Sequence, residues 1–242
     1  MLIKTRAIVL RNIKYGEQKI IVDLLTETEG RVSVVTRIPQ TQRGKLKKQY
    51  FQPMTLLEVD VDIRGRADLQ HLRDVRLSHP YSDIPFNPFK LSITLFLAEF
   101  VYYSTRIEQQ NSPLFAYIEN SLLWLDACPA NYSNFHLVFM MRLSRFIGFF
   151  PNIDDYHDGD YFDMRAASFT AHAPIHTYFL SSDEAARIST LMRMNYESMH
   201  LFKMNHTDRN RILDVLVAYY RLHVPDFPEL RSLPVVRDLW AE

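Results

Sequence analysis

Hydrophobic and polar positions follow two different periods along this chain. Up to about Ser78 the period is close to two: from Leu57 to Ile63 every second residue is aliphatic and the residues between them are carboxylates. Runs of β-branched residues occur at 20–22 and 32–35. Such alternation is typical of strands with one buried face, whereas past His79 the spacing becomes helical. The pattern predicts a sheet-forming region followed by a helical one.

The first region divides into five predicted strands, at about 4–13, 18–26, 31–38, 54–64 and 69–78. Gly16, Gly30 and Gly65 each separate two strand-like runs, where a turn needs a residue free to adopt positive φ. The longest connection falls between the third and fourth strands. This arrangement predicts a small closed barrel of the oligonucleotide-binding (OB) type. An SH3-like barrel has a similar number of strands, so both architectures stay open at this point.

The second region begins after a segment, 80–88, that holds three prolines and is predicted to be a linker. Ser112 and Pro113 fit the N-cap and first helical positions of one helix. The predicted fold class is α+β with two domains, an OB-type barrel at 1–80 and a helical domain at 81–242. The predicted helices span about 88–108, 112–127 and 133–149, a stretch that starts at Ser181 or Ser182, and about 207–223.

Charge is segregated although the chain as a whole is neutral, with 28 basic and 28 acidic residues. Residues 1–80 carry 15 basic and 9 acidic residues, a net charge of +6, so the remainder carries −6. Between Gly30 and Leu57 there are six basic residues and no acidic one: Arg31, Arg37, Arg43, Lys45, Lys47 and Lys48. A positive face of this kind attracts polyanions. It predicts a nucleic-acid-binding module, and the competing interpretation is a solvated surface loop.

The chemistry of these residues suits a polynucleotide. Lys and Arg neutralise phosphates, and most of the six lie in the long connection where OB-type proteins often grip their ligand. Tyr50, directly after the basic segment, is a candidate for stacking on a base. Tyr50 and the neighbouring Phe51 equally suit the barrel core, so both interpretations stay open.

Other classes of function find little support in the sequence. The apolar stretches are interrupted by charges and are shorter than the roughly 20 residues of a membrane span, and the amino terminus lacks the apolar stretch of a signal peptide. We expect a cytoplasmic protein without a membrane contact. Cys128 is the single cysteine, which excludes a cysteine-cluster zinc site. The acidic loop at 154–163 suits either a divalent cation or solvent. We expect no catalytic residue, no metal and no cofactor.

Several segments in the same order resemble the RecO family of bacterial recombination mediators. The likeness starts with Lys4–Arg11, Tyr15–Glu17 and 20–27, and continues through the Gly30 turn, the basic segment and Pro53–Glu58. Leu137–Pro151 resembles the central helix of that family. The stretch Tyr219–His223, with Ser232 and Leu233, resembles its closing helix and tail. The resemblance covers most of the chain.

The resemblance implies a non-enzymatic DNA repair and recombination protein with an OB barrel and a helical domain. Such a protein binds single- and double-stranded DNA, anneals complementary strands, and with RecR helps to load RecA onto strands coated by single-strand-binding protein. It works at the nucleoid. Many members carry a four-cysteine zinc site, but the insert at about 152–173 has no cysteine here. We therefore expect a metal-free β-hairpin packed by Tyr161, Phe162 and Phe169 in place of the zinc knuckle.

Arg142 and Arg145 form an i, i+3 pair on an otherwise apolar helix. In the family, the helical domain receives the acidic, aromatic-ended C-terminal tail of single-strand-binding protein, and this pair suits that peptide. Its alternative is intramolecular pairing with the acidic loop at 154–163. Two functions therefore stay in view: a DNA-binding mediator, and a generic protein-interaction module or metal-dependent hydrolase with an incidental basic loop.

Overall fold

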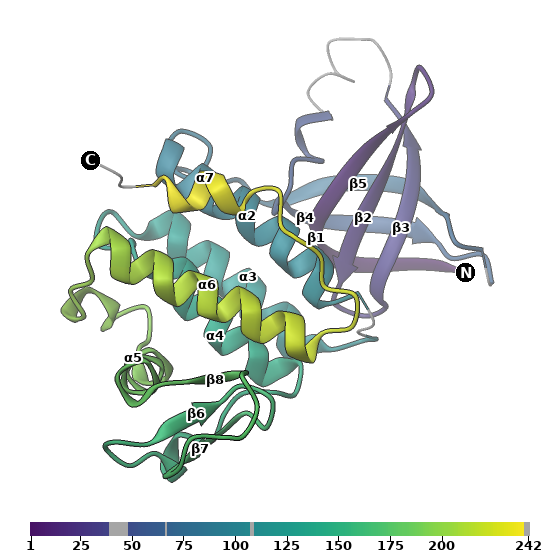
Figure 1. The fold of residues 1–242 in the computed structure, drawn as a ribbon. Helices are drawn as coiled ribbons and strands as arrows, with labels where there is room; N and C mark the ends of the chain where they lie inside the picture. The colour runs from purple at the N-terminus through teal and green to yellow at the C-terminus, as the bar shows by residue number, and fades with distance from the viewer. Residues whose placement is uncertain (39–47, 66, 107–108, 240–242) are drawn as a thin grey trace. The chain divides into compact units, whose positions relative to one another are not determined.

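The computed structural model describes residues 1–38, 48–65, 67–106 and 109–239, and Figure 1 shows the order of the elements along the chain. The strands are β1 (Leu2–Tyr15), β2 (Lys19–Thr26), β3 (Gly30–Arg37), β4 (Leu56–Asp62), β5 (Gln70–His79), β6 (Tyr161–Asp163), β7 (Ser168–Thr170) and β8 (Phe179–Leu180). The α-helices are α2 (Pro88–Ser104), α3 (Ser112–Ala127), α4 (Phe135–Phe146), α5 (Ser182–Arg193), α6 (His206–His223) and α7 (Leu233–Arg237). None of the helices in the described part of the chain is both long and apolar enough to cross a membrane.

The chain forms two compact units. The first comprises Met1–Ala127 with Leu230–Val236, and the second comprises Cys128–Glu229 with the segment that starts at Arg237. The first unit contains the barrel, α2 and α3, and the second contains α4, α5, α6 and a small sheet. The sequence boundary near residue 80 marks the change from strands to helices, and as a domain boundary it stays a prediction.

The first five strands close into a barrel in the order β1-β2-β3-β5-β4. Every neighbouring pair is antiparallel except β3 and β5, which pair in parallel at Val34↔Gln70 and Val35↔His71. This order is that of the OB barrel and decides against the SH3-like alternative. The predicted fold class is therefore confirmed. The predicted strands are correct to within a few residues, and β1 extends two residues further at each end.

The barrel core is filled by side chains that alternate along the strands. Val22 and Val34 lie opposite each other on β2 and β3, and both are completely buried. Their neighbours in sequence, Asp23 and Ser33, therefore point to the outer face of the sheet. This assignment of inner and outer positions fixes which basic residues face outward.

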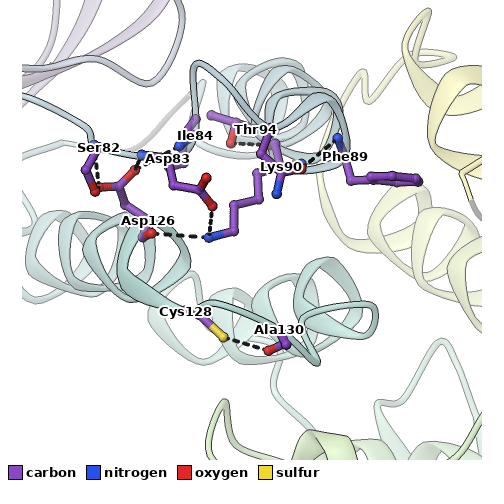
Figure 2. Close-up of polar contacts among 10 residues, drawn as sticks. Ser82, Asp83, Ile84, Phe89, Lys90, Thr94, Asp126, Cys128 and Ala130 are labelled. Atoms are coloured by element: carbon purple, nitrogen blue, oxygen red, sulfur yellow. Dashed lines mark hydrogen bonds and ion pairs between the residues drawn. The ribbon is translucent and has the colours of Figure 1, made fainter.

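The proline-dense segment expected to be a linker is instead held against α3, as Figure 2 shows. The carboxylate of Asp126 accepts hydrogen bonds from the backbone N–H groups of Ser82, Asp83 and Ile84 at 2.8–2.9 Å, and from the Ser82 hydroxyl. Lys90 is completely buried, and its Nζ lies 2.7 Å from Asp83 Oδ2 and donates to the Asp126 carbonyl. These contacts order a segment whose composition suggests flexibility.

One predicted helix cap is one residue too late. The side chain of Asn111 accepts a hydrogen bond from Leu114 N at 3.0 Å, so Asn111 is the N-cap of α3 and Ser112 is the first helical residue. Asn and Ser are both preferred N-cap residues, and sequence alone does not choose between adjacent candidates.

The second unit contains the expected hairpin. β6 and β7 pair antiparallel through Phe162↔Phe169, and β8 adds a third strand that the sequence did not predict. The centres of the Phe162 and Phe169 rings lie 5.0 Å apart, and both side chains are buried. Phe162 also packs against Tyr219 of α6. Tyr161 is only partly buried and contacts Phe179 instead.

Candidate nucleic-acid interface

The outer face of β1, β2 and β3 carries a cluster of basic side chains. Residues directly opposite each other in an antiparallel pair point to the same side, and Arg11, Asp23 and Ser33 are opposite one another across the three strands. Arg31, two residues before Ser33, shares that side. Outward positions at 11–15, 19–23 and 31–37 thus hold four basic residues, Arg11, Lys19, Arg31 and Arg37, and one carboxylate, that of Asp23.

Arg31 is anchored to α2. Its Nη1 donates to the Tyr102 carbonyl at 2.7 Å, and its guanidinium carbon lies 4.3 Å from the centre of the Tyr102 ring. Burial lowers the pKa of the Arg31 guanidinium, and the nearby positive charge of Arg106 lowers it further. Arginine stays charged at neutral pH even so. Arg31 therefore contributes positive potential to the face while one of its donors is occupied within the protein.

Arg11 completes this cluster of basic side chains, although the sequence pattern did not predict it as a site residue. Its guanidinium lies 4.2 Å from the same Tyr102 ring and forms an ion pair with Asp23 at 3.0 Å. Asp23 also accepts a hydrogen bond from Ser33. Strand alternation places residues 11, 23 and 31 on one face of the sheet, which could have indicated Arg11. Using that alternation requires the register of three strands, which the sequence alone does not give.

Of the other residues of the predicted DNA-binding site, some are described by the structure and some are not. Arg37, at the end of β3, is exposed and lines a groove of about 190 Å³ together with Arg73 and Phe51. Lys48 is also exposed. The predicted contacts Arg43, Lys45 and Lys47 lie outside the described residues. The two basic residues that are described at either end of the segment, Arg37 and Lys48, are therefore open to solvent.

The two aromatic residues after the basic segment belong largely to the barrel. Phe51 is 3% exposed and is part of the barrel core, and Tyr50 is partly buried against that core. For Phe51 the structure favours the core interpretation over stacking. Tyr50 is only partly buried, and its contact with a base stays a prediction.

The arginine pair on α4 makes contacts within the second unit. Nε and Nη2 of Arg142 donate to the carbonyl of Met194, at the end of α5, at 2.9 and 2.6 Å. Arg145 is exposed, and its guanidinium carbon lies 4.1 Å from the centre of the Phe150 ring. Neither residue forms an ion pair with the acidic loop among the residues that the structure describes. Their role in binding a partner stays a prediction.

The acidic loop is built from turns. Asp163 accepts hydrogen bonds from Arg165 N and Ala166 N and lies 3.1 Å from His176 Nε2. Burial opposes its ionisation, but these contacts outweigh burial and lower the pKa of Asp163. In the described part of the chain no group of three or more His, Cys, Asp or Glu residues is arranged to hold a metal ion. With Cys128 as the sole cysteine, a four-cysteine zinc site does not fit this chain.

The barrel order and the basic outer face define a protein of the OB-fold class joined to a helical unit. Two family models match the chain: "Recombination protein O N terminal" at residues 1–81 and "Recombination protein O C terminal" at residues 85–234. Together these models cover most of its length, in the order in which the two parts occur in the sequence.

Curated relatives match over the whole chain. A "DNA repair protein RecO" of Bacteroides fragilis is 49% identical over 241 residues, which cover 99% of this chain and 100% of the relative. Proteins of the same name from Phocaeicola vulgatus and Flavobacterium johnsoniae are 46% and 31% identical, each alignment covering 100% of both chains. The chain belongs to the RecO family of DNA repair proteins.

Proposed function

We propose that this protein is a non-enzymatic mediator of DNA repair and homologous recombination that binds single- and double-stranded DNA and anneals complementary strands. With RecR, it assists RecA in replacing single-strand-binding protein on coated strands, at the nucleoid in the cytoplasm. The observation that carries the proposal is the cluster of outward-facing basic side chains on an OB barrel, together with the basic segment 37–48 that follows β3 in the sequence.

The electrostatics support DNA over a solvated loop. The outer face holds four basic residues and one carboxylate, that of Asp23, which pairs with Arg11, so the face keeps a net positive charge after this pairing. Exposed cations that gain no partner within a fold are free to release counterions from a phosphate backbone. Arg37 and Lys48 are the described residues best placed for such contacts, and Arg31 and Arg11 set the local potential behind them.

The test is a charge reversal of the basic segment. A variant with Arg43, Lys45, Lys47 and Lys48 all changed to Glu should lose DNA binding and strand annealing while its thermal unfolding midpoint stays nearly constant. A control reverses Arg193 and Lys203, two exposed basic residues of the other unit, and should keep DNA binding. Unchanged affinity in the first variant would rule out this site.

Strand annealing separates the proposed function from its alternatives. A mediator should anneal complementary oligonucleotides without nucleotide or metal, because the chain lacks a phosphate-cradling glycine motif and the annealing step needs only charge neutralisation. A metal-dependent hydrolase would instead shorten the strands when a divalent cation is added, and chelation would stop it.

For the helical unit we propose that Arg145 and Arg142 receive the acidic tail of single-strand-binding protein. Arg145 is exposed beside Phe150, so it offers a charge next to an aromatic surface. Arg142 is tied to the end of α5, so its removal also disturbs that helix end. Arg145→Ala is therefore the cleaner variant: it should weaken binding of a tail peptide several-fold, and full affinity in both Arg145→Ala and the Arg142→Ala, Arg145→Ala double variant would contradict the proposal.

A further inference from the structure

The tip of the β1–β2 hairpin carries a row of three exposed side chains on the outer face. Tyr15 lies directly opposite Lys19, and Lys19 lies directly opposite Arg37. All three are exposed, and Tyr15 has 53% of its surface open. We call these residues the tyrosine row. On the outer face it lies two rows along the strands from the row of Arg11 and Asp23.

The intervening row is aliphatic. Ile13, Ile21 and Val35 are opposite one another on the same three strands, and they share the outward side because each is two residues from a member of the tyrosine row. Ile13 is 42% exposed, and the other two are partly buried. On the solvent side of an antiparallel sheet, alternate positions are normally polar. An exposed tyrosine next to an aliphatic strip is therefore a surface suited to an apolar ligand.

Charge complementarity identifies that ligand. Lys19 and Arg37 stand beside the tyrosine on the same row, so the surface offers apolar contact and positive charge within one patch. A single-stranded polynucleotide presents the matching pair of features: exposed faces of unpaired bases and an anionic backbone. A duplex has the backbone but hides the faces of its bases, and it therefore matches only the charges.

We propose that Tyr15 stacks on an unpaired base of a single strand, with Ile13 and Ile21 flanking it and with Lys19 and Arg37 holding the adjacent phosphates. This inference rests on the proposed DNA-binding function and adds to it the part of the surface that distinguishes single strands from duplexes. The basic residues attract both forms of DNA, and the tyrosine row favours the unpaired one.

The test compares Tyr15→Ala with Tyr15→Phe in the full chain. Affinities are measured for an oligo-dT strand and for a duplex of equal length, at one fixed salt concentration. Tyr15→Ala should weaken single-strand binding on the order of ten-fold and duplex binding by less than about two-fold, because stacking is lost and charge is kept. Tyr15→Phe keeps an aromatic face and should retain single-strand affinity.

Two further readouts identify the roles within the row. The fluorescence of 2-aminopurine in a single strand should be quenched on binding to the wild type and to Tyr15→Phe, and less so on binding to Tyr15→Ala. Lys19→Gln should lower the salt dependence of single-strand binding by about 0.7 in log-log slope, whereas Tyr15→Ala should leave the slope unchanged.

The outcomes separate the two proposals. If the wild type binds single strands and Tyr15→Ala binds them equally well, the stacking role is overturned and the DNA-binding function stands. A parallel loss on single strands and duplexes would also overturn it, since the row would then not select unpaired bases. If the wild type binds neither form of DNA, the proposed function itself fails. Because Tyr15 is exposed, the thermal midpoint of Tyr15→Ala should match that of the wild type.

Discussion

At the residue scale, Gly30 shows how one position is constrained both by its backbone and by a distant segment. It has φ +67°, and a Cβ added there would lie 2.7 Å from the carbonyl carbon of Gln109. Gly16 has nearly the same φ, +70°, but nothing lies within 4 Å of the corresponding Cβ position. Both glycines therefore adopt the positive φ that disfavours other residues, but only at Gly30 would a side chain also collide with a neighbouring backbone.

Gly30→Ala should therefore be more damaging than Gly16→Ala. The left-handed conformation costs a residue with a Cβ about 1–2 kcal/mol, and this applies to both variants. Gly30→Ala adds the displacement of the Gln109 backbone, for which we expect about 1–3 kcal/mol more. Urea unfolding of the two variants measures the difference. Equal free energies of unfolding would show that the segment at Gln109 moves without cost.

His136 is the residue whose charge should couple the second unit to pH. It is completely buried on α4, and burial, assisted by the positive charge of Arg209, lowers its pKa to about 3. An unfolded histidine has a pKa of about 6.5. As the pH falls below about 6.5 the unfolded chain takes up a proton that the folded chain does not, so stability should fall until the pH reaches about 3.

His136→Gln should remove this dependence. The wild type is expected to lose on the order of 1 kcal/mol more per pH unit than the variant between about pH 6 and pH 4. Urea unfolding at several pH values gives both curves, and parallel curves would mean that His136 is protonated in the folded protein. Above about pH 7 the two slopes should agree, which controls for all other titrating groups.

At the element scale, the join between β5 and α2 depends on a single carboxylate. Burial opposes ionisation of Asp126, but the hydrogen bonds from Ile84, Ser82 and Asp83 outweigh burial and lower the pKa of Asp126. The segment thus obtains its backbone partners from α3, as Figure 2 shows. A carboxylate that accepts several N–H groups at once fixes the direction in which the chain enters α2.

Asp126→Ala should destabilise the first unit by about 3 kcal/mol or more, because it leaves three backbone N–H groups without their acceptor. Asp68 is exposed, and Asp68→Ala is the matched control, for which we expect a change within about 0.5 kcal/mol. Thermal or urea unfolding measures both. A small effect of Asp126→Ala would indicate that water replaces the carboxylate.

The small sheet β6–β8 should hold its shape without zinc. Phe162 is 2% exposed between Phe169 and Tyr219, so apolar packing occupies the centre of this element. Phe162→Ala should cost about 3–5 kcal/mol, whereas Tyr161→Ala, at a partly buried position, should cost less. Protein incubated with zinc and then desalted should retain less than one equivalent of the metal, and a chelator should leave the unfolding midpoint unchanged. One tightly held equivalent would refute this expectation.

At the scale of the whole molecule, a neutral chain is expected to behave as a cationic one toward DNA. The net charge is zero, yet residues 1–80 carry +6. Binding to a polyanion responds to the charges within a Debye length of the contact, about 10 Å at 0.1 M salt, and not to the total. The positive charge of residues 1–80 should therefore determine DNA binding more than the isoelectric point of the whole chain does.

If all six basic residues between 31 and 48 contact a single strand, the logarithm of the affinity should fall against the logarithm of salt concentration with a slope of about −4. Arg31 has one donor occupied by the Tyr102 carbonyl, so its contribution should be the smallest of the six. Arg37→Gln should reduce the slope by about 0.7, and Arg145→Ala should not change it. A slope near zero in the wild type would contradict a phosphate-binding site.

Local sequence was enough to predict most of the elements. Strand alternation and positive-φ glycines located the five barrel strands, because these signals depend only on neighbours along the chain. The same holds for α3, α5 and α6, which begin within one or two residues of their predicted starts. The hairpin at 161–170 was also predictable, but β8 was not, because a two-residue strand has too little pattern of its own.

The sequence by itself determined the five strands, most of the helices and the segregation of charge, since period, turn residues and composition are local properties. The strand order that separates an OB barrel from an SH3-like one was decided by the tertiary structure. Only the tertiary structure decided that Arg31 is anchored at Tyr102, that Asp126 orders the proline-dense segment, and that Tyr15, Lys19 and Arg37 form one row. The physical reason is that each of these contacts joins residues far apart in the chain. Strand register and helix packing bring these residues together, and neither can be predicted from a single stretch of sequence.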